Sequence, residues 1–508
     1  MRRARILVPA LSLGLLAGSL IVAPVQAAPP PPSVDATAFA PTLTYVTCPA
    51  DEKLPPRTRC ATLTVPLDWQ TPDDGKTIEI ALRVTRSKQR GGGFTFNPGG
   101  PGGSGTEIGL TVYSLLPTQV RDRFDFVSWD PRGVGLSGPA LTDCSPSAAA
   151  DLPATGPVDW QAYWEAQLAA TAAANAACLA ANPDTASALG TWQVIRDLEA
   201  MRIALGYAQW NYWGMSYGTR IGNAYARTFP TSLRALIMDG SVRAGETLYR
   251  LGTTWPAGVQ VAQQVYASLN GRAQAHKINT ILTYLDDSVI TVGGSSLTRW
   301  DFYTYVGPNG AFRRQANYPE VRARVNSLYD YVTAPTPSAR ARALRGLGDT
   351  LTRILQGNDI AVVNPLVNCA DLPDRPTASQ IAAASIAAER QYGTASPRGM
   401  INASQCAGLP ADMSPASPNG TSTITLATPP MFVLSTGDPA TAWVGGRSMA
   451  NTFARSRTIS YAGTQHVTYL RTPSACVNDP VTRYLLTLQR PRADISCAFT
   501  PSPPPPPQ

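Results

Sequence analysis

The sequence predicts an α/β protein whose mostly parallel sheet is flanked by helices, with a large and mostly helical segment inserted before the last strands. Strand and helix patterns alternate between residues 60 and 239, which is typical of a parallel sheet with helices on its faces. From about 243 to 425 helical patterns dominate, and strand character returns at 430–436. With 508 residues, the chain is long enough to bury a large core and carry such an insertion.

The individual elements follow from hydrophobic periodicity and from helix-ending residues. Period-two alternation or short apolar runs predict strands at 60–68, 78–86, 93–96, 124–129, 210–215 and 234–239. A helix is expected over 192–205, where apolar residues recur at helical spacing until Gly206, and another over 217–229, which Pro230 ends. The strands expected at 430–436 and 457–461 should rejoin the same sheet after the insertion.

The N-terminus has the pattern of a signal peptide. Three arginines, at positions 2, 3 and 5, precede an apolar stretch from 6 to 22, and Val25-Gln26-Ala27 offers small residues for cleavage. We therefore expect a signal peptide over 1–27, in preference to a retained anchor helix. The mature protein should be secreted, extracellular or periplasmic, without stable membrane insertion.

Composition then divides the rest of the chain. A Pro- and Ala-rich leader is expected over 28–44 and a Pro-rich tail over 500–508, because neither segment can pack a core. Between them we expect a first core part (45–242), a cap (243–425) and a second core part (426–499). Beyond the first thirty residues no apolar run is long enough to span a bilayer, so a multi-span membrane protein is excluded.

The charge of the chain gives no sign of a nucleic-acid partner. The net charge is +8, from 42 basic and 34 acidic residues, and the arginines are scattered rather than grouped into a basic arm. We therefore expect no nucleic-acid partner. The sequence does not determine the oligomeric state.

The cysteines favour disulfides over a metal site. There are eight of them, no C-x-x-C pair, and two histidines in the whole chain, so no metal or cofactor is expected. In an oxidising compartment an even number of cysteines suggests disulfide bridges. Sequence alone leaves the connectivity open, but the simplest framework joins neighbours: Cys48–Cys60, Cys144–Cys178, Cys369–Cys406 and Cys476–Cys497.

A nucleophile motif lies between the strand at 210–215 and the helix that follows it. Residues 214–218 read Gly-Met-Ser-Tyr-Gly and fit G-x-S-x-G, in which a sharp strand-to-helix turn exposes the serine. A side chain at Gly214 or Gly218 would clash in so tight a turn. The motif predicts Ser216 as a catalytic nucleophile, and the alternative is a plain Gly-Ser turn.

The general base and the acid can be chosen by their order in the chain. His466 follows the strand at 457–461, as the order serine, acid, histidine requires, whereas His276 lies in the inserted helices and should be a solvated helix residue. Asp438 follows the strand at 430–436 and should orient His466. Asp239, at the end of the strand at 234–239, is the competing acid, with a turn-capping role as its other interpretation.

The oxyanion hole needs backbone N–H donors near the nucleophile. Tyr217, the residue after Ser216, should supply one of them. The other is expected in the glycine-rich loop at 97–105, and Gly100 is our choice. A phosphate-binding loop is the alternative for this segment, but neither a following G-K-[ST] nor a complete dinucleotide fingerprint is present.

Four strings together resemble the secreted tripeptidyl aminopeptidase branch of the α/β-hydrolases, relatives of the prolyl aminopeptidases: NPGGPGGSG (97–105), WDPRGVGLSG (129–138), GMSYGTRIG (214–222) and GDPAT (437–441). The resemblance covers about 45–499, with a TAP-like part at roughly 390–499. It implies a serine exopeptidase of the α/β-hydrolase fold with Ser216, Asp438 and His466 as the triad and 98–102 as the oxyanion loop. Pro98 replaces the histidine of prolyl aminopeptidases, and Gln465 replaces a glycine common in relatives.

The expected function is therefore the release of short peptides or residues from a free N-terminus. Such an enzyme should present a carboxylate to the substrate ammonium, and the candidates are Glu107, Glu246, Asp371 and Glu389. The same triad could instead serve a secreted esterase or amidase for small non-peptide substrates, because this fold hosts many chemistries. A non-catalytic binding module is a third possibility, which the intact triad disfavours. Asp130 and Arg132 should form a structural turn.

Overall fold

The protein is described here from a computed structural model. The structure describes residues 40–50, 53–138, 140–144, 152–292, 295–302, 306, 314–343, 363–393, 400–415 and 417–501. The expected signal peptide (1–27), most of the expected leader and residues 502–508 of the expected tail lie outside these residues.

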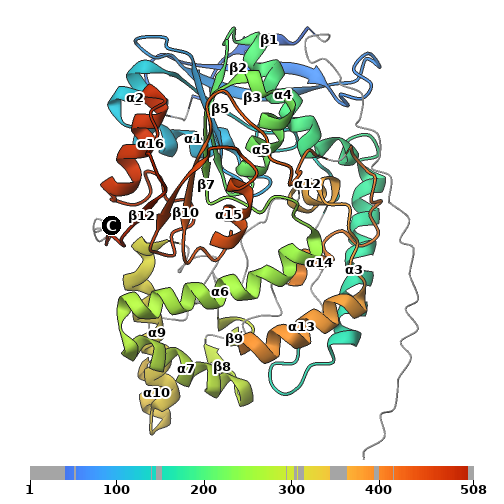
Figure 1. The fold of residues 1–508 in the computed structure, drawn as a ribbon. Coiled ribbons are helices and arrows are strands. Elements are labelled where there is room, and N and C mark those ends of the chain that lie inside the picture. Colours follow the sequence, from blue (N-terminus) through green and yellow to red (C-terminus); the bar gives the residue numbers. More distant parts are fainter. Residues whose placement is uncertain are drawn as a thin grey trace, which may run out of the picture. The chain divides into compact units, whose positions relative to one another are not determined.

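Ten strands of the described residues form one sheet, in the order β1-β2-β3-β5-β4-β6-β7-β10-β11-β12 (Figure 1). The first strands, β1 to β3, pair antiparallel with one another, and β3 pairs antiparallel with β5; all later pairs are parallel. The prediction of a mostly parallel sheet is thereby confirmed. The strands are β1 (Thr42–Val46), β2 (Thr58–Pro66), β3 (Thr77–Thr85), β4 (Gly93–Asn97), β5 (Asp125–Trp129), β6 (Trp210–Met215), β7 (Leu233–Asp239), β10 (Met431–Ser435), β11 (Arg457–Tyr461) and β12 (Ile495–Cys497).

The central strands are apolar on both faces because helices cover both faces of the sheet. In β6, Trp210 and Tyr212 join one hydrophobic cluster while Trp213 and Met215 join another, as the period of two requires. Helices α4 (Thr191–Ala204) and α5 (Gly218–Thr228) contribute to the first cluster. The second cluster receives residues of α1 (Gly105–Leu115), α2 (Thr118–Arg123) and α16 (Ala475–Thr487).

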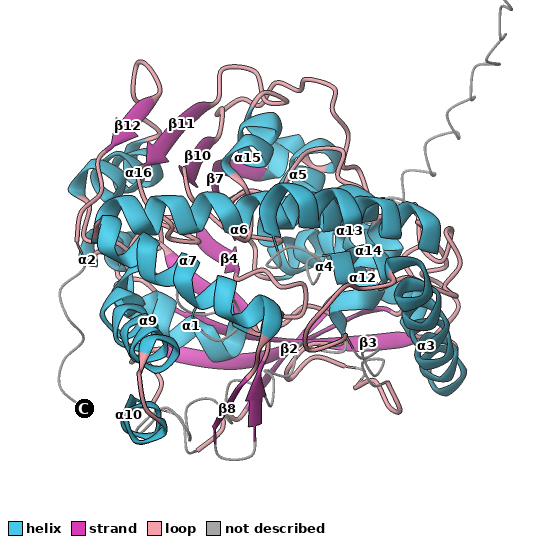
Figure 2. Ribbon diagram, turned by 90° about the horizontal axis from the view of Figure 1, so that it is seen from below, coloured by secondary structure: helices cyan, strands magenta, loops and turns pink. Residues whose placement is uncertain are grey.

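The segment between β7 and β10 is mostly helical, as the sequence predicts. Its helices include α6, which lies across the strands when the molecule is viewed from below (Figure 2). A short antiparallel hairpin of β8 and β9 interrupts the helices and was not predicted. The elements are α6 (Leu248–Asn270), α7 (Arg272–Asp287), β8 (Ile290–Val292), β9 (Ser295–Leu297), α9 (Tyr318–Thr333), α10 (Pro337–Ala343), α12 (Val363–Asp371), α13 (Ala378–Tyr392) and α14 (Ile401–Ser404).

Helix α3 (Trp160–Ala181) packs on the inserted helices, although the sequence places it in the first core part. The indole nitrogen of Trp164 donates to Ser385 Oγ at 2.8 Å, and that of Trp160 donates to Glu389 at 2.8 Å. Trp160 and Trp164 share a hydrophobic cluster with Trp300. The cap is therefore built from two parts of the chain: the insertion between β7 and β10, and the long connection between β5 and α4.

The folded part begins slightly before its expected N-terminal boundary. Strand β1 begins at Thr42, inside the segment assigned to the leader, and pairs with β2 from Thr42 opposite Thr64. At the other end, β12 adds an unpredicted edge strand beside β11. No helix among the described residues is long and apolar enough to cross a membrane.

Four disulfides join neighbouring cysteines along the chain. They are Cys48–Cys60, Cys144–Cys178, Cys369–Cys406 and Cys476–Cys497. Bridges of this kind typically contribute about 2–4 kcal/mol each, mainly by restricting the unfolded chain. Cys369 lies on α12, so one bridge fastens that helix within the inserted segment.

Candidate active site

Ser216 occupies the sharp turn between β6 and α5. Its φ is +53°, a left-handed conformation that is uncommon for a residue with a side chain. The turn needs both flanking glycines. A methyl group at Gly214 would lie 2.5 Å from the carbonyl oxygen of Gly218, and one at Gly218 would lie 2.5 Å from that of Asn97. The local geometry is therefore that of a nucleophile elbow.

Asp438 and His466 form a buried hydrogen-bonded pair in the loops after β10 and β11. His466 Nδ1 lies 2.8 Å from Asp438 Oδ2 and 3.1 Å from Oδ1. The carboxylate also accepts hydrogen bonds from the backbone amides of Ala440 and Thr441 and from the Thr441 hydroxyl at 2.9 Å. These bonds fix the aspartate, which in turn fixes the ring and directs Nε2 away from it.

The end of β7 connects the elbow to the histidine loop. The Ser216 amide donates to the carbonyl oxygen of Asp239 at 2.9 Å, and a methyl group at the next residue, Gly240, would lie 3.3 Å from the His466 ring. The Asp239 carboxylate accepts the backbone amides of Thr468 and Tyr469 at 2.8 and 2.9 Å. Asp239 therefore holds the backbone beyond His466, while Asp438 bonds the ring. Burial raises the pKa of Asp239 to about 7.

The glycine-rich loop after β4 packs directly on the elbow. A methyl group at Gly99 would lie 2.8 Å from Ser216 Cβ and 3.1 Å from the Tyr217 amide nitrogen. The Gly99 amide is already used, because it donates to Asn97 Oδ1 at 2.9 Å. Among the described residues, the amides of Gly100 and Tyr217 have no protein acceptor. Gly100 directly follows Gly99, so the two sequence-predicted donors belong to segments that meet at the elbow.

The DPRG turn after β5 is hydrogen-bonded to the end of this loop through Asp130. Asp130 accepts hydrogen bonds from the Ser104 hydroxyl and from the amide and hydroxyl of Thr106, at 2.7 to 2.9 Å. Arg132 is fully buried and forms a bidentate ion pair with Asp197 at 2.6 and 2.7 Å. Asp130 therefore fastens the start of α1, where the glycine-rich loop ends, and Arg132 fastens the same turn to α4.

Sequence reasoning missed helix α12, which bonds both the glycine-rich loop and α5, the helix that follows the elbow. From α12, Asn364 Nδ2 donates to the carbonyl oxygen of Pro101 at 3.0 Å. One turn later, Asn368 Oδ1 accepts from Arg220 on α5 at 3.0 Å. No local pattern in the sequence marks these asparagines, because their partners lie 263 and 148 residues away.

The same helix ends at Asp371, which holds the residue after the nucleophile. Asp371 accepts the amide and hydroxyl of Thr191 at 2.8 and 2.6 Å, and the Thr191 hydroxyl lies 2.5 Å from the Tyr217 hydroxyl. Arg220 completes the cluster with an ion pair to Asp371 at 3.2 Å. Helix α12 therefore contacts the glycine-rich loop directly through Asn364, and it is linked to Tyr217 of the elbow through Thr191.

We expect Asn364→Ala to lower kcat about tenfold with little change in KM, because the loss of one hydrogen bond lets the oxyanion loop shift. Steady-state kinetics and the rate of fluorophosphonate labelling at Ser216 would measure it. Asn175→Ala is a matched control, since Asn175 donates to the backbone oxygens of Gln405 and Ala407 inside the cap. A purely structural role for Asn364 would make the two variants alike.

The structure separates the four acids proposed for the substrate ammonium. Asp371 is fully committed to Thr191 and Arg220, and Glu389 accepts from Trp160 within the α3–α13 packing. Glu107 is exposed on α1. Glu246 lines a pocket beside the Asp438 turn, and its Oε1 atom is buried without a hydrogen-bond partner among the described residues. His276 lies on α7 and contacts the Tyr329 ring on α9.

Two family models match the chain. Residues 94–311 match the alpha/beta hydrolase fold, and residues 393–497 match the TAP-like protein model. The first match contains Ser216, and the second contains Asp438 and His466. Ser216, Asp438 and His466, which follow β6, β10 and β11, are thus divided between the two matched ranges.

Relatives span nearly the whole chain. Serine protease Hip1 of Mycobacterium tuberculosis is 30% identical over 467 residues, 88% of each protein. The tripeptidyl aminopeptidase of Streptomyces lividans is 27% identical over 468 residues, 89% of this chain and 86% of that protein. Carboxylesterase B of M. tuberculosis is 28% identical over 526 aligned residues, 96% and 97% of the two chains.

Among solved structures, proline iminopeptidase of Mycobacterium smegmatis matches 84% of this chain and 97% of its own at 15% identity, with a TM-score of 0.37. This structural likeness is too weak to support an inference about function. The assignment rests instead on the family models and on the relative that is 30% identical over 88% of both chains. The chain therefore belongs to the α/β-hydrolase family and is a serine hydrolase of the peptidase branch that carries a TAP-like C-terminal part.

Proposed function

We propose that this protein is a secreted serine exopeptidase that hydrolyses peptide bonds near a free N-terminus through an acyl-enzyme on Ser216. The observation that carries the proposal is the buried Asp438–His466 pair, whose hydrogen bond is 2.8 Å long. The end of β7 connects this pair to Ser216, because Asp239 accepts the Ser216 amide and Gly240 lies against the His466 ring. Two relatives support peptide substrates, since one is named a serine protease and the other a tripeptidyl aminopeptidase.

The proposed reaction uses the groups in the order in which the geometry presents them. His466 takes the proton of Ser216 as its oxygen attacks the substrate carbonyl, and Asp438 stabilises the imidazolium that forms. The amides of Gly100 and Tyr217 stabilise the negative oxygen of the tetrahedral intermediate. His466 then protonates the leaving amine as the peptide C–N bond breaks. A water molecule, activated by the same histidine, releases the acyl group and restores Ser216.

The cap supports an exopeptidase rather than an enzyme that cleaves within folded chains. A methyl group at Gly258 of α6 would lie 3.2 Å from the carbonyl oxygen of Pro439, so α6 lies against the turn that holds Asp438. Asn364 of α12 contacts the oxyanion loop through Pro101. Inserted helices therefore meet the site from two directions, and a short peptide end is better suited to enter than a folded chain.

Secretion is part of the same proposal. Disulfides persist in oxidising compartments, and this chain has four that together use all eight cysteines. The N-terminal pattern of arginines, an apolar stretch and small residues supports export by a cleaved signal peptide. N-terminal sequencing of the mature protein tests this, with Ala28 as the expected first residue.

A secreted esterase or amidase for small acyl substrates is the second candidate, favoured by the relative named Carboxylesterase B. The two functions differ in the leaving group that they handle. We expect a tripeptidyl p-nitroanilide with a free N-terminus to be cleaved with a kcat/KM at least tenfold above that for p-nitrophenyl butyrate, although the ester is intrinsically more reactive. The reverse ratio in the same assay would favour the esterase.

A further inference from the structure

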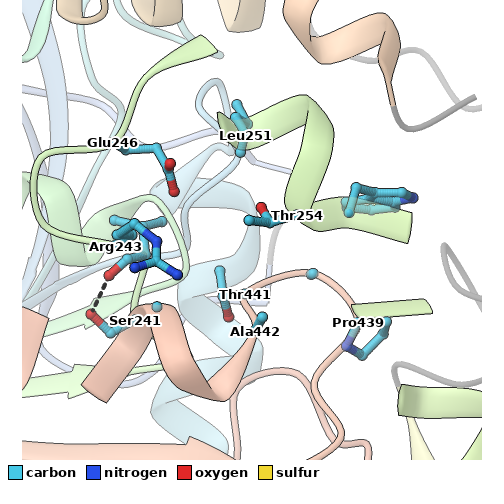
Figure 3. Close-up of a pocket in the computed structure, with 12 residues that line it drawn as sticks. Ser241, Arg243, Glu246, Leu251, Thr254, Pro439, Thr441 and Ala442 are labelled. Carbon is cyan, nitrogen blue, oxygen red and sulfur yellow. Dashed lines mark hydrogen bonds between the residues drawn. The ribbon is translucent and has the colours of Figure 1, made fainter. Parts of the chain in front are cut away.

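The cap meets the core on both sides of the Asp438–His466 pair, and the two contacts differ. On the Asp438 side a pocket lies between α6 and the turn after this aspartate, with Thr254 on one wall and Thr441 on another (Figure 3). On the His466 side the 3₁₀ turn η3 (Gln315–Asn317) of the cap is hydrogen-bonded to the residue before the histidine. The cap thus bonds directly to the loop that carries His466.

Gln465 makes this connection with its side-chain amide, in a residue that is 4% exposed. Its Oε1 atom accepts the backbone amide of Gln315 at 3.2 Å. Its Nε2 atom donates to the carbonyl oxygens of His466 and Val467, at 3.0 and 3.2 Å. One side chain therefore joins the cap to the backbone of His466. The glycine common at this position in relatives has no side chain that could form these bonds.

The turn after His466 needs support of this kind. Val467 has a φ of +61°, in the left-handed region that β-branched residues rarely adopt. Such a conformation persists only where the surrounding contacts hold it. Asp239 holds the turn through the next two backbone amides, and Gln465 holds it through two carbonyl oxygens. Loss of the Gln465 side chain would therefore free one side of the turn and let the His466 ring shift.

The cap end of the connection is held by the C-terminal segment that follows β12. Gln315 Nε2 donates to the Thr500 carbonyl oxygen at 2.9 Å, and Gln315 Oε1 accepts the Tyr461 hydroxyl at 2.7 Å. The Phe499 ring stacks on Tyr318 of α9 with their centroids 6.2 Å apart, and it packs against hydrophobic clusters of both the cap and the core. The backbone of Gln315 is thereby fixed relative to the sheet.

We propose that Gln465 is a positioning residue that keeps His466 aligned with Ser216 only while η3 is seated on the core. A ligand that displaces η3 would break the bond from the Gln315 amide and loosen the turn after His466, so the base would lose its alignment. Substrates that fit beneath the seated cap are then hydrolysed at the full rate. This inference rests on the proposed role of His466 as general base and adds a control of that base by the cap.

The test compares Gln465→Met with the unmodified enzyme, because methionine fills a similar volume without the three hydrogen bonds. We expect Q465M to lose about tenfold in kcat on a tripeptidyl p-nitroanilide and about tenfold in the rate of fluorophosphonate labelling, with KM changed less than twofold. Both reactions need an aligned base, whereas substrate binding does not. Gln193→Met is the matched control and should keep kcat, because Gln193 is a buried residue of α4 that accepts the Trp69 backbone amide at 2.9 Å.

A second variant tests the cap end of the connection. Gln315→Met keeps the backbone amide that binds Gln465 but removes the side-chain bonds to Thr500 and Tyr461. We expect Q315M to lower kcat about fivefold and the double variant Q315M/Q465M to be no slower than Q465M, because both residues act through one connection. Losses in kcat that multiply in the double variant would overturn the control by the cap.

The outcomes separate this inference from the proposed function. If His466→Ala is inactive while Q465M keeps the kcat and labelling rate of the unmodified enzyme, the triad stands and the role of Gln465 is wrong. If His466→Ala stays active, His466 is not the base and both proposals fail. Should Q465M not fold, Gln465→Glu replaces it, since a carboxylate accepts the Gln315 amide but donates nothing to the carbonyl oxygens. The same loss in kcat supports the proposal, and an unchanged kcat overturns it.

Discussion

Replacing Ser216 with alanine is expected to lower kcat by roughly 10⁴- to 10⁶-fold, because the acyl-enzyme can no longer form. The fold should be unaffected, since the substitution removes one hydroxyl from a turn whose hydrogen bonds are made by its backbone. The Ser216 amide donates to Asp239, and its carbonyl oxygen accepts from Thr219. Hydrolysis of a tripeptidyl p-nitroanilide measures the loss, and thermal unfolding checks the fold.

The two histidines of the chain provide a matched comparison for this assignment. His466→Ala should lose activity on the same scale, because the proton of Ser216 then has no acceptor, whereas His276→Ala on α7 should retain it. His276 makes its ring contact with Tyr329, inside the inserted segment. If Ser216→Ala keeps more than a few per cent of activity, or if His276→Ala loses most of it, the triad is assigned to the wrong residues.

The elbow could be predicted from the sequence because its determinants are local. Five consecutive residues fix the turn, and the clashes expected at Gly214 and Gly218 appear as 2.5 Å approaches to backbone oxygens. The strands that precede Ser216 and Asp438 could also be predicted, since β6 and β10 are short, mostly apolar and buried at every position. The order serine, acid, histidine that the predicted fold requires then favoured His466 over His276.

Features that depend on long-range packing could not be predicted in this way. Helix α3 was not predicted from the sequence, which assigned its residues to the first core part, and only its tryptophans, bonded to Ser385 and Glu389, place it with the cap. Strand β1 pairs with β2 alone, and most of its residues are exposed. Its pattern of alternating hydrophobic residues is therefore weak. The brace formed by Asn364 needed the three-dimensional structure for the same reason, because neither its type nor its spacing signals Pro101.

The four candidate acids show where sequence reasoning reaches its limit. Three of these carboxylates lie in or near the insertion and Glu107 lies beside the glycine-rich loop, and composition cannot distinguish them. The structure does so by accounting for their hydrogen bonds. Asp371 is occupied by Thr191 and Arg220, and Glu389 by Trp160, whereas Glu246 keeps a buried oxygen without a partner in the described part of the chain. An unsatisfied buried acceptor is a property of the folded chain, and no motif encodes it.

Acetylation of the substrate N-terminus is expected to suppress cleavage of a short peptide by about 10²-fold or more. Acetylation removes the positive charge and adds bulk where the cap leaves little room, since α6 already lies against the turn at Pro439. A charged group bound in a site shielded from water loses much of its binding energy when its partner is removed, because the remaining buried charge stays uncompensated. The measurement is kcat/KM on one tripeptidyl p-nitroanilide in free and acetylated form.

The size of that ratio also decides between the two functions that the triad could serve. An esterase or an endopeptidase makes no use of a free amine, so it should cleave both forms at similar rates. A ratio near one would exclude the aminopeptidase while leaving Ser216, Asp438 and His466 in place, since fluorophosphonate labelling would still succeed. A large ratio carried mainly by KM would indicate that the ammonium anchors the substrate, and one carried by kcat would indicate that it also aligns the scissile bond with Ser216.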